Sequence, residues 1–166
     1  RGINKVSWNL RGTPPKVAAG STKIDGAGFT APMVLPGTYT IKLKINDKEY
    51  TSSVKCIHDE KNKDMSLEDR KLVYEKSMQL LNLYNSVNKT IDSISFYQKL
   101  LKEDTAAFAK SKNAIAFYDD LQKTKSELMA TKKVSIFAEE KRVREKVSEL
   151  YGNFCGMEAK PNSTQI

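Results

Sequence analysis

The chain has 166 residues, of which 39% are apolar and 29% charged, the usage of an ordinary globular protein. A chain of this length can bury about 70% of its unfolded surface, so it can form a core without disulfides or metals. The composition excludes collagen-like, low-complexity and wholly disordered proteins, and no apolar run is long enough to predict a transmembrane helix. The chain begins at Arg1 without an initiator methionine or a signal peptide, and we expect a piece of a longer protein.

The formal net charge is +8, and most of it lies in the first third of the chain. Residues 1–58 carry nine Lys or Arg against three Asp or Glu, whereas residues 59–166 carry nineteen against seventeen. A basic region can bind nucleic acid or another polyanion, which would show as salt-dependent binding. No five-residue run within residues 1–58 is mostly basic, however, so we expect a solvated lysine-rich surface and no nucleic-acid partner.

Glycine and proline divide the chain into a turn-rich front and an uninterrupted back. Six of the eight glycines and four of the five prolines lie in residues 1–37, and none lies between Thr38 and Tyr151. Because these residues interrupt regular structure, the split predicts separate β and α parts. We expect a partial β-sandwich subdomain over 1–58, a helical bundle over 59–159 and a polar tail or linker over 160–166.

The first predicted strand covers Val6 to Leu10, where apolar and polar residues alternate. Trp8 lies on its apolar face and is expected to be buried there. Arg11 follows and could pair with an acid or cap backbone carbonyls of the loop over 12–36. A loop of that length is unusual, and we expect it to be functional or draped over a face of the domain.

A hairpin is predicted after this loop. Pro36 and Gly37 suit a turn that leads into a strand over Thr38 to Ile45, with Tyr39 on its apolar face and expected to be buried. Asn46-Asp47 tolerates a tight turn, and Tyr50 to Ile57 returns as a weaker strand. Only three strands then precede residue 59, whereas an Ig-like sandwich needs about seven. We therefore expect an uncovered sheet that either pairs two copies of the chain as a homodimer or packs against the helices.

Three amphipathic helices are predicted in the back part. Ser66 and Asp69 resemble a capping box and begin a helix over about 66–102, a second helix starts at Asp104 or Thr105, and a third follows a polar turn at 131–133. Gly152 or Gly156 would end the third helix. Short connections imply an antiparallel three-helix bundle or a long helical hairpin, and the first helix outruns its partners.

Each helix carries an apolar stripe that we expect to face inward. The first stripe consists of Val73, Leu80, Tyr84, Val87, Ile91, Ile94 and Leu101. The second consists of Phe108, Ile115, Tyr118, Leu121, Leu128 and Met129. The third consists of Ile136, Val143, Val147, Leu150 and Phe154. The helical aromatic residues Tyr84, Phe96, Tyr97, Phe117 and Tyr118 are expected in the core.

Residues for catalysis or metal binding are scarce. His58 is the single histidine and stands beside Asp59, but no nucleophile motif accompanies it, so it is a weak candidate. Cys56 and His58 alternate onto one strand face without the further ligands that zinc needs. We expect no catalytic residue, no metal and no cofactor, and we expect Cys56 and Cys155 to be free thiols.

Both ends of the chain resemble a known family. Residues 2–11 read Gly-Ile-Asn-Lys-Val-Ser-Trp-Asn-Leu-Arg, and residues 31–43 read Ala-Pro-Met-Val-Leu-Pro-Gly-Thr-Tyr-Thr-Ile-Lys-Leu. They resemble the G-x-N-x-V-x-W-D-L-R … PPGTYTVxL signature near the C-terminus of large bacterial proteins with a sortilin-type propeller of BNR (Asp-box) repeats, often described as glycosyl hydrolases. Residues 149–154 and 161–165 are similar to the LYGAV … PTxxQ segment of that family.

The resemblance implies an Ig-like accessory β-sandwich over 1–58, of the kind also found in flagellar hook-capping proteins. It implies a parent that is exported to the periplasm or cell surface, with an upstream propeller as partner in the same polypeptide. The propeller is not part of this chain, Asn9 replaces the usual aspartate, and the family's D-P-R is here His58-Asp59-Glu60. We therefore expect a non-catalytic accessory module, in which Trp8, Arg11, Pro36, Gly37 and Tyr39 are scaffold.

Two further alternatives stay open. The chain could be a carbohydrate-binding module that uses the 12–36 loop with Trp8, Arg11 and Tyr39, which requires exposed aromatic side chains. It could also be a fragment of a hydrolase that uses His58.

Overall fold

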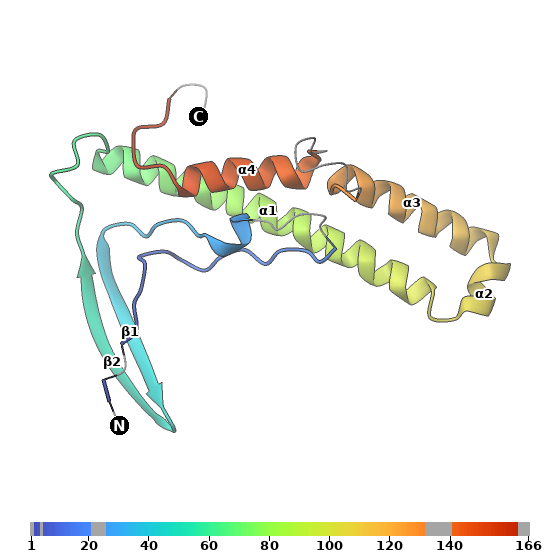
Figure 1. Ribbon diagram of the computed structural model, residues 1–166, viewed down its shortest axis with the longest axis horizontal. Coiled ribbons are helices and arrows are strands. Elements are labelled where there is room, and N and C mark those ends of the chain that lie inside the picture. Colours follow the sequence, from blue (N-terminus) through green and yellow to red (C-terminus); the bar gives the residue numbers. More distant parts are fainter. Residues whose placement is uncertain (1, 4, 21–25, 132–140, 163–166) are drawn as a thin grey trace.

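The computed structural model describes residues 2–3, 5–20, 26–131 and 141–162. The chain is an α+β protein in which a two-stranded antiparallel sheet projects like an arm from an elongated helical body (Figure 1). Its elements are η1 (Gly26–Phe29), β1 (Gly37–Ile45), β2 (Lys48–Cys56), α1 (Leu67–Leu101), α2 (Thr105–Lys110), α3 (Lys112–Leu128) and α4 (Val143–Cys155). The division into a β front and an α back is as the glycine and proline distribution predicts.

The helical body is built on α1, whose start is the predicted one. The Ser66 hydroxyl accepts a hydrogen bond from the Asp69 amide at 3.1 Å and donates one to the Asp69 carboxylate at 2.7 Å, so the first turn is capped. In the predicted stripe of α1, Val73, Tyr84, Val87, Ile91 and Ile94 are buried.

The shorter helices α4 and α3 lie one after the other along α1 (Figure 1). The first turns of α1 extend beyond α4 (Figure 1), and there Val73 is buried beside Met33, Phe154 and Met157, so the expected bare end of the stripe is covered. The arrangement differs from three helices packed side by side.

The second predicted helix is interrupted. Asp104 caps α2 through the Ala107 amide at 2.9 Å, as expected. At Ser111 the backbone is extended, with φ −100° and ψ 103°, and the Ser111 hydroxyl caps α3 through the Ala114 amide at 3.2 Å. A serine that can accept from the amide three residues later allows a new helix to begin in the middle of a periodic pattern. Ile115 of the predicted stripe is exposed, whereas Met129 is buried.

The third predicted stripe is correct for Val147 and Phe154 but wrong for Val143 and Leu150. Val143 and Leu150 are exposed, whereas Arg144, Val147, Tyr151 and Phe154 are buried. The inward face was predicted from apolar residues alone, so the buried Arg144 was not among its residues. Gly156 ends α4 as expected, with its amide bonded to the Gly152 carbonyl at 3.0 Å. Ile136, the lysines of the predicted turn at 131–133 and residues 163–165 of the tail lie outside the described residues.

The helical aromatic side chains separate into two groups. Tyr84 is fully buried, as expected, but Phe96, Tyr97 and Phe117 are exposed. In α1, Phe96 and Tyr97 lie across the helix from the buried stripe, because both α3 and α4 pack on that one stripe. The prediction that these three form part of the core is therefore wrong.

The predicted hairpin is confirmed. β1 and β2 pair from Gly37↔Cys56 to Ile45↔Lys48, and Asn46 takes the left-handed conformation (φ 54°) that the tight turn requires. No described helix packs on the apolar face of β1, however, and Ile41, Leu43 and Ile45 are each about half exposed. No described helix lies over this arm (Figure 1).

The predicted strand over Val6 to Leu10 does not form. Leu10 adopts a positive φ of 58°, and backbone pairing begins only where Leu10 and Gly12 bond to Val34 and Pro32. Without a neighbouring strand no sheet covers the Trp8 ring, which is 43% exposed, so the prediction that Trp8 is buried is wrong. The alternation of apolar and polar residues is typical of a strand, but it does not show whether a partner strand is present.

Candidate interaction surfaces

The five residues that we expect to be scaffold lie at the joint between the arm and the helical body. The Trp8 ring packs edge-on against the Tyr39 ring, with centroids 5.3 Å apart, and its Nε1 donates to the Arg11 carbonyl at 2.9 Å. The Tyr39 hydroxyl donates to the Leu35 carbonyl at 2.6 Å, next to Pro36. Gly37 is the first residue of β1 and pairs with Cys56. Each contact is within the chain, as expected of scaffold.

Arg11 connects the joint to the end of α4. Its Nη1 donates to the Ala31 carbonyl at 2.7 Å and to the Cys155 carbonyl at 2.9 Å. Ala31 belongs to the long loop, so the expectation that Arg11 caps loop carbonyls is confirmed. A charged donor on the last carbonyls of a helix is also favoured by the helix dipole. This one side chain holds residues 31 and 155 together.

The described parts of the loop, residues 12–20 and 26–36, lie along the helices. Ala18, Ala27 and Ala31 are buried, and the Tyr151 hydroxyl donates to the Thr30 carbonyl at 3.0 Å. A Cβ at Gly28 would lie 2.5 Å from Val17 Cγ2, so the loop packs closely on itself at that point. Much of the loop is therefore part of the fold.

A buried polar cluster that sequence reasoning missed ties the loop to α1 and α4. The Asn88 side-chain oxygen accepts from the Ala18 amide at 2.9 Å and from Arg144 Nε at 3.1 Å. Arg144 is 1% exposed and also pairs with Glu145 at 3.1 Å. Buried charges are rare without such partners. The sequence did hold a signal for this cluster. Arg144 lies at helical spacing from the buried Val147 and Tyr151, which places it on the inward face of α4.

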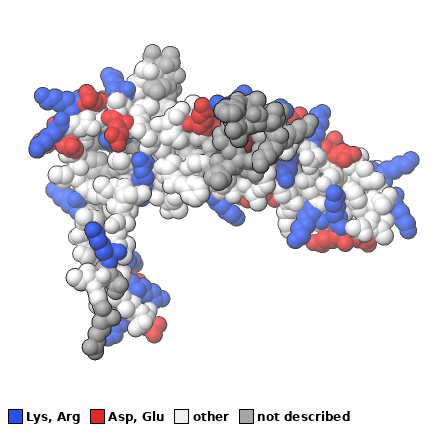
Figure 2. Space-filling model, viewed as in Figure 1, with Lys and Arg blue, Asp and Glu red and all other residues white. Residues whose placement is uncertain are grey.

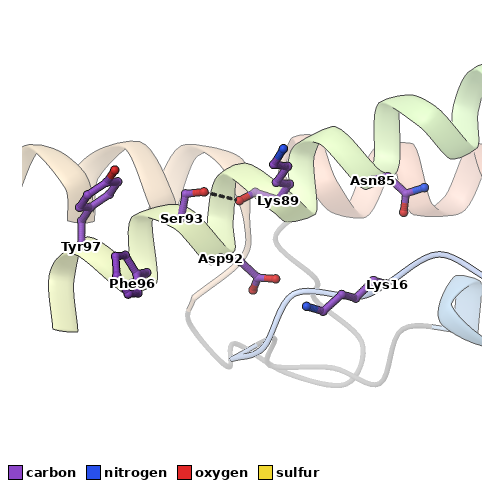
Figure 3. A pocket seen from close by; sticks show the side chains of 7 residues that line it. All are labelled: Lys16, Asn85, Lys89, Asp92, Ser93, Phe96 and Tyr97. Carbon is purple, nitrogen blue, oxygen red and sulfur yellow. Dashed lines mark hydrogen bonds between the residues drawn. The ribbon is translucent and has the colours of Figure 1, made fainter. Parts of the chain in front are cut away.

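A groove of about 530 Å³ opens on the other side of α1. Its lining comes from α1 and from the long loop, and consists of Lys16, Asn85, Lys89, Asp92, Ser93, Phe96 and Tyr97. Figure 3 shows Lys16 of the loop reaching toward Asp92, with the two aromatic rings at one end of the row. Phe96 and Tyr97 contact each other edge-on at 5.6 Å and are 61% and 50% exposed. Volume, aromatic rings and a few polar groups suit a small polar ligand.

On the face of the molecule drawn in Figure 2, basic side chains do not gather into one patch. In Figure 2 lysine and arginine are spread over the arm and both ends of the helical body and alternate with acidic residues. A nucleic-acid site usually has basic residues concentrated along one face. This face of the molecule therefore agrees with a solvated lysine-rich surface.

The described residues bring together no catalytic or metal-binding group. His58 is half-buried beyond the end of β2 and has no hydrogen bond or ion pair within the described chain. The described residues also contain no cluster of three His, Cys, Asp or Glu that could hold a metal ion.

Cys56 and Cys155 are free, as expected. Burial raises the pKa of the Cys155 thiol, and Tyr151 and Arg11 lie near it. Burial likewise raises the pKa of Tyr151. A thiol held protonated is a poor nucleophile, so Cys155 is part of the packing.

No helix in the described part of the chain is both long and apolar enough to cross a membrane. Comparison with protein-family models, with curated proteins and with solved structures finds no match to this chain.

Proposed function

We propose that the chain is a non-catalytic C-terminal accessory module of a larger exported bacterial protein with a sortilin-type (BNR-repeat) propeller. The observation that carries the proposal is the joint, where Trp8, Arg11 and Tyr39 contact their own chain. These are the residues on which the resemblance depends. Their contacts support a scaffold role.

The finer architecture follows from the same proposal. The arm supplies one two-stranded layer of an Ig-like sandwich, and the helical body is an antiparallel brace that Arg11 joins to it. A module of this kind spaces or supports a neighbouring domain. Its partner is the upstream propeller, its setting is the periplasm or cell surface, and any glycosidase activity belongs to that propeller.

The first test is the gene itself. The sequence upstream of residue 1 should encode propeller repeats with Asp-box turns, and a different domain there would refute the proposal. The second test uses the isolated chain and a panel of chromogenic glycosides. It should hydrolyse none of them, and turnover that disappears in His58→Ala would favour the hydrolase alternative.

The full-length protein gives a third test with a matched control. Arg11→Ala should lower its thermal stability and leave the kcat of any glycosidase activity unchanged, because the Arg11 guanidinium bonds to backbone carbonyls of this chain. Lys55→Ala, an exposed lysine of the arm, should change neither quantity. A loss of kcat in Arg11→Ala without a loss of stability would contradict the scaffold role.

The groove on α1 favours carbohydrate binding as a second candidate function, at a place other than Trp8 and Tyr39. Exposed aromatic rings stack on sugars, and Lys16 belongs to the 12–36 loop. Soluble polysaccharides in a native gel should then retard the chain, and Phe96→Ala should abolish the retardation. Phe117→Ala is the control, because Phe117 is also an exposed aromatic residue of a helix but lies on α3. Equal mobility in all gels would exclude this function.

A further inference from the structure

The arm has one face without charge over most of its length. Neighbouring side chains of a strand point to opposite faces, so the register places on one face Tyr39, Ile41, Leu43, Ile45, Tyr50, Ser52 and Val54, with Lys48 at the tip. Ile41, Leu43, Ile45 and Tyr50 are each 50–53% exposed. An isolated two-stranded hairpin is at best marginally stable in water, so this face needs a cover.

The joint extends the same face toward the body. Trp8 contacts Tyr39 and is itself 43% exposed, so its ring adds to the apolar area. The described helices pack on one another and lie away from the arm (Figure 1). The cover therefore has to come from outside the described chain.

The charges of the arm lie on its other face. Lys42, Lys44 and Lys55 alternate away from the apolar side chains, and Lys42 pairs with Glu49 at 3.0 Å. A cover on the apolar face leaves all of these charges in water. A lipid surface is a poorer match, since the lysines that would bind anionic headgroups point away from the side that would insert.

We infer that the apolar face of the arm is a dimer interface and packs against the same face of a second copy of this chain. Such a face is self-complementary, and a two-fold axis places the lysines of both copies outside a four-stranded sandwich. Because the arm projects from the helical body (Figure 1), we expect the two helical bodies of such a dimer to lie clear of each other.

The exposed apolar area of the arm limits how strongly two copies can associate. The exposed apolar side chains amount to roughly 500 Å² per copy, so the dimer would bury on the order of 1,000 Å², the lower end for specific interfaces. An interface of that size is at the weak end of specific association, so we expect the dimer to dissociate on dilution. The inference goes beyond the accessory role, because it joins two parent proteins through their modules.

Sedimentation equilibrium of the isolated chain from about 1 to 500 µM tests it. The wild type should pass from monomer to dimer, and the emission of Trp8, the single tryptophan, should shift to the blue with concentration. The double variant Ile41→Thr/Leu43→Thr keeps β-forming residues but removes the apolar contact, and should weaken association at least tenfold. The control Lys42→Thr/Lys44→Thr changes the alternate positions of the same strand and should dimerise as the wild type does.

Four outcomes would overturn the inference. A wild-type monomer throughout the range excludes the dimer, and equal loss in both double variants shows that another surface is responsible. Association that survives replacement of residues 37–56 by a short linker does the same and does not depend on the folding of a variant arm. A monomer that binds anionic phosphatidylglycerol vesicles would assign the face to a lipid surface instead.

Discussion

Arg11 is the residue that most directly links distant parts of the chain. Its guanidinium donates to carbonyls of residues 31 and 155, 20 and 144 positions away. We expect Arg11→Ala to lower the free energy of unfolding by about 1–3 kcal/mol, because bonds to a charged donor are lost and two carbonyls lose their partner. Urea denaturation measures the effect. Lys55→Ala on the exposed face of the arm is the control and should stay within about 0.5 kcal/mol of the wild type.

The raised pKa of Cys155 predicts that the free energy of unfolding depends on pH. Burial raises its pKa in the folded chain, so the folded state holds the thiol proton more tightly than the unfolded state does. The stabilisation is complete below about pH 8.5, the ordinary pKa of cysteine, and is lost as the pH rises through the folded value. Tyr151, whose pKa is also raised, extends the decline to higher pH.

The measurement is the free energy of unfolding between pH 7 and pH 10. Its decline should be shallower in Cys155→Ala than in wild type and unchanged in Cys56→Ala. The comparison uses slopes, so a constant loss from the smaller side chain does not matter. A wild-type slope of zero would show that Cys155 titrates alike in both states.

At the scale of elements, Asn88 holds three segments in register. It bonds to the Ala18 amide, to Arg144 and, through Nδ2, to the Tyr84 carbonyl at 2.8 Å. Asn88→Ala should cost about 2–4 kcal/mol of stability, because the buried Arg144 then loses a hydrogen-bond acceptor. Hydrogen exchange should show the Ala18 amide losing its protection. Asn85→Ala, exposed and almost one turn earlier in α1, should leave both quantities unchanged.

At the scale of the whole molecule, the arm and the helical body are separable. Gly37 and Cys56 are paired neighbours, so a short glycine-serine linker can replace residues 37–56 without moving the ends. The helical body should keep its circular dichroism spectrum and most of its thermal stability, because the described helices bury their faces against each other. Loss of the helical signal would show that the arm is part of the same cooperative unit.

Local pattern predicted the elements well where they depend on neighbouring residues. The start of α1 at Ser66, the break at Asp104 and the stop at Gly156 rest on contacts within a few positions, and the hairpin joins two strands that are adjacent in the sequence. The joint residues were identified through a resemblance, and Arg11 does bond to the loop. Its second partner, the Cys155 carbonyl, could not be foreseen because 144 positions separate the two.

The wrong predictions concern segments whose packing partner cannot be identified from the residue pattern. Val6 to Leu10 alternates like a strand but has no strand to pair with, so Trp8 stays exposed. Phe96 and Tyr97 look like core residues but lie across α1 from its packed stripe. Arg144 looks like a surface residue but is buried because Asn88 and Glu145 supply its partners.

The sequence by itself determined the α+β class, the hairpin and its turn, the helix ends and the free thiols, because each depends on local backbone preferences or on the absence of partner residues. Only the tertiary structure decided that α4 and α3 follow each other along α1, that Asn88 and Arg144 form a buried cluster, and that the apolar face of the arm is uncovered. Hydrophobic burial is non-directional, so an apolar stripe demands a cover without specifying which element supplies it. That choice is made by packing over the whole chain.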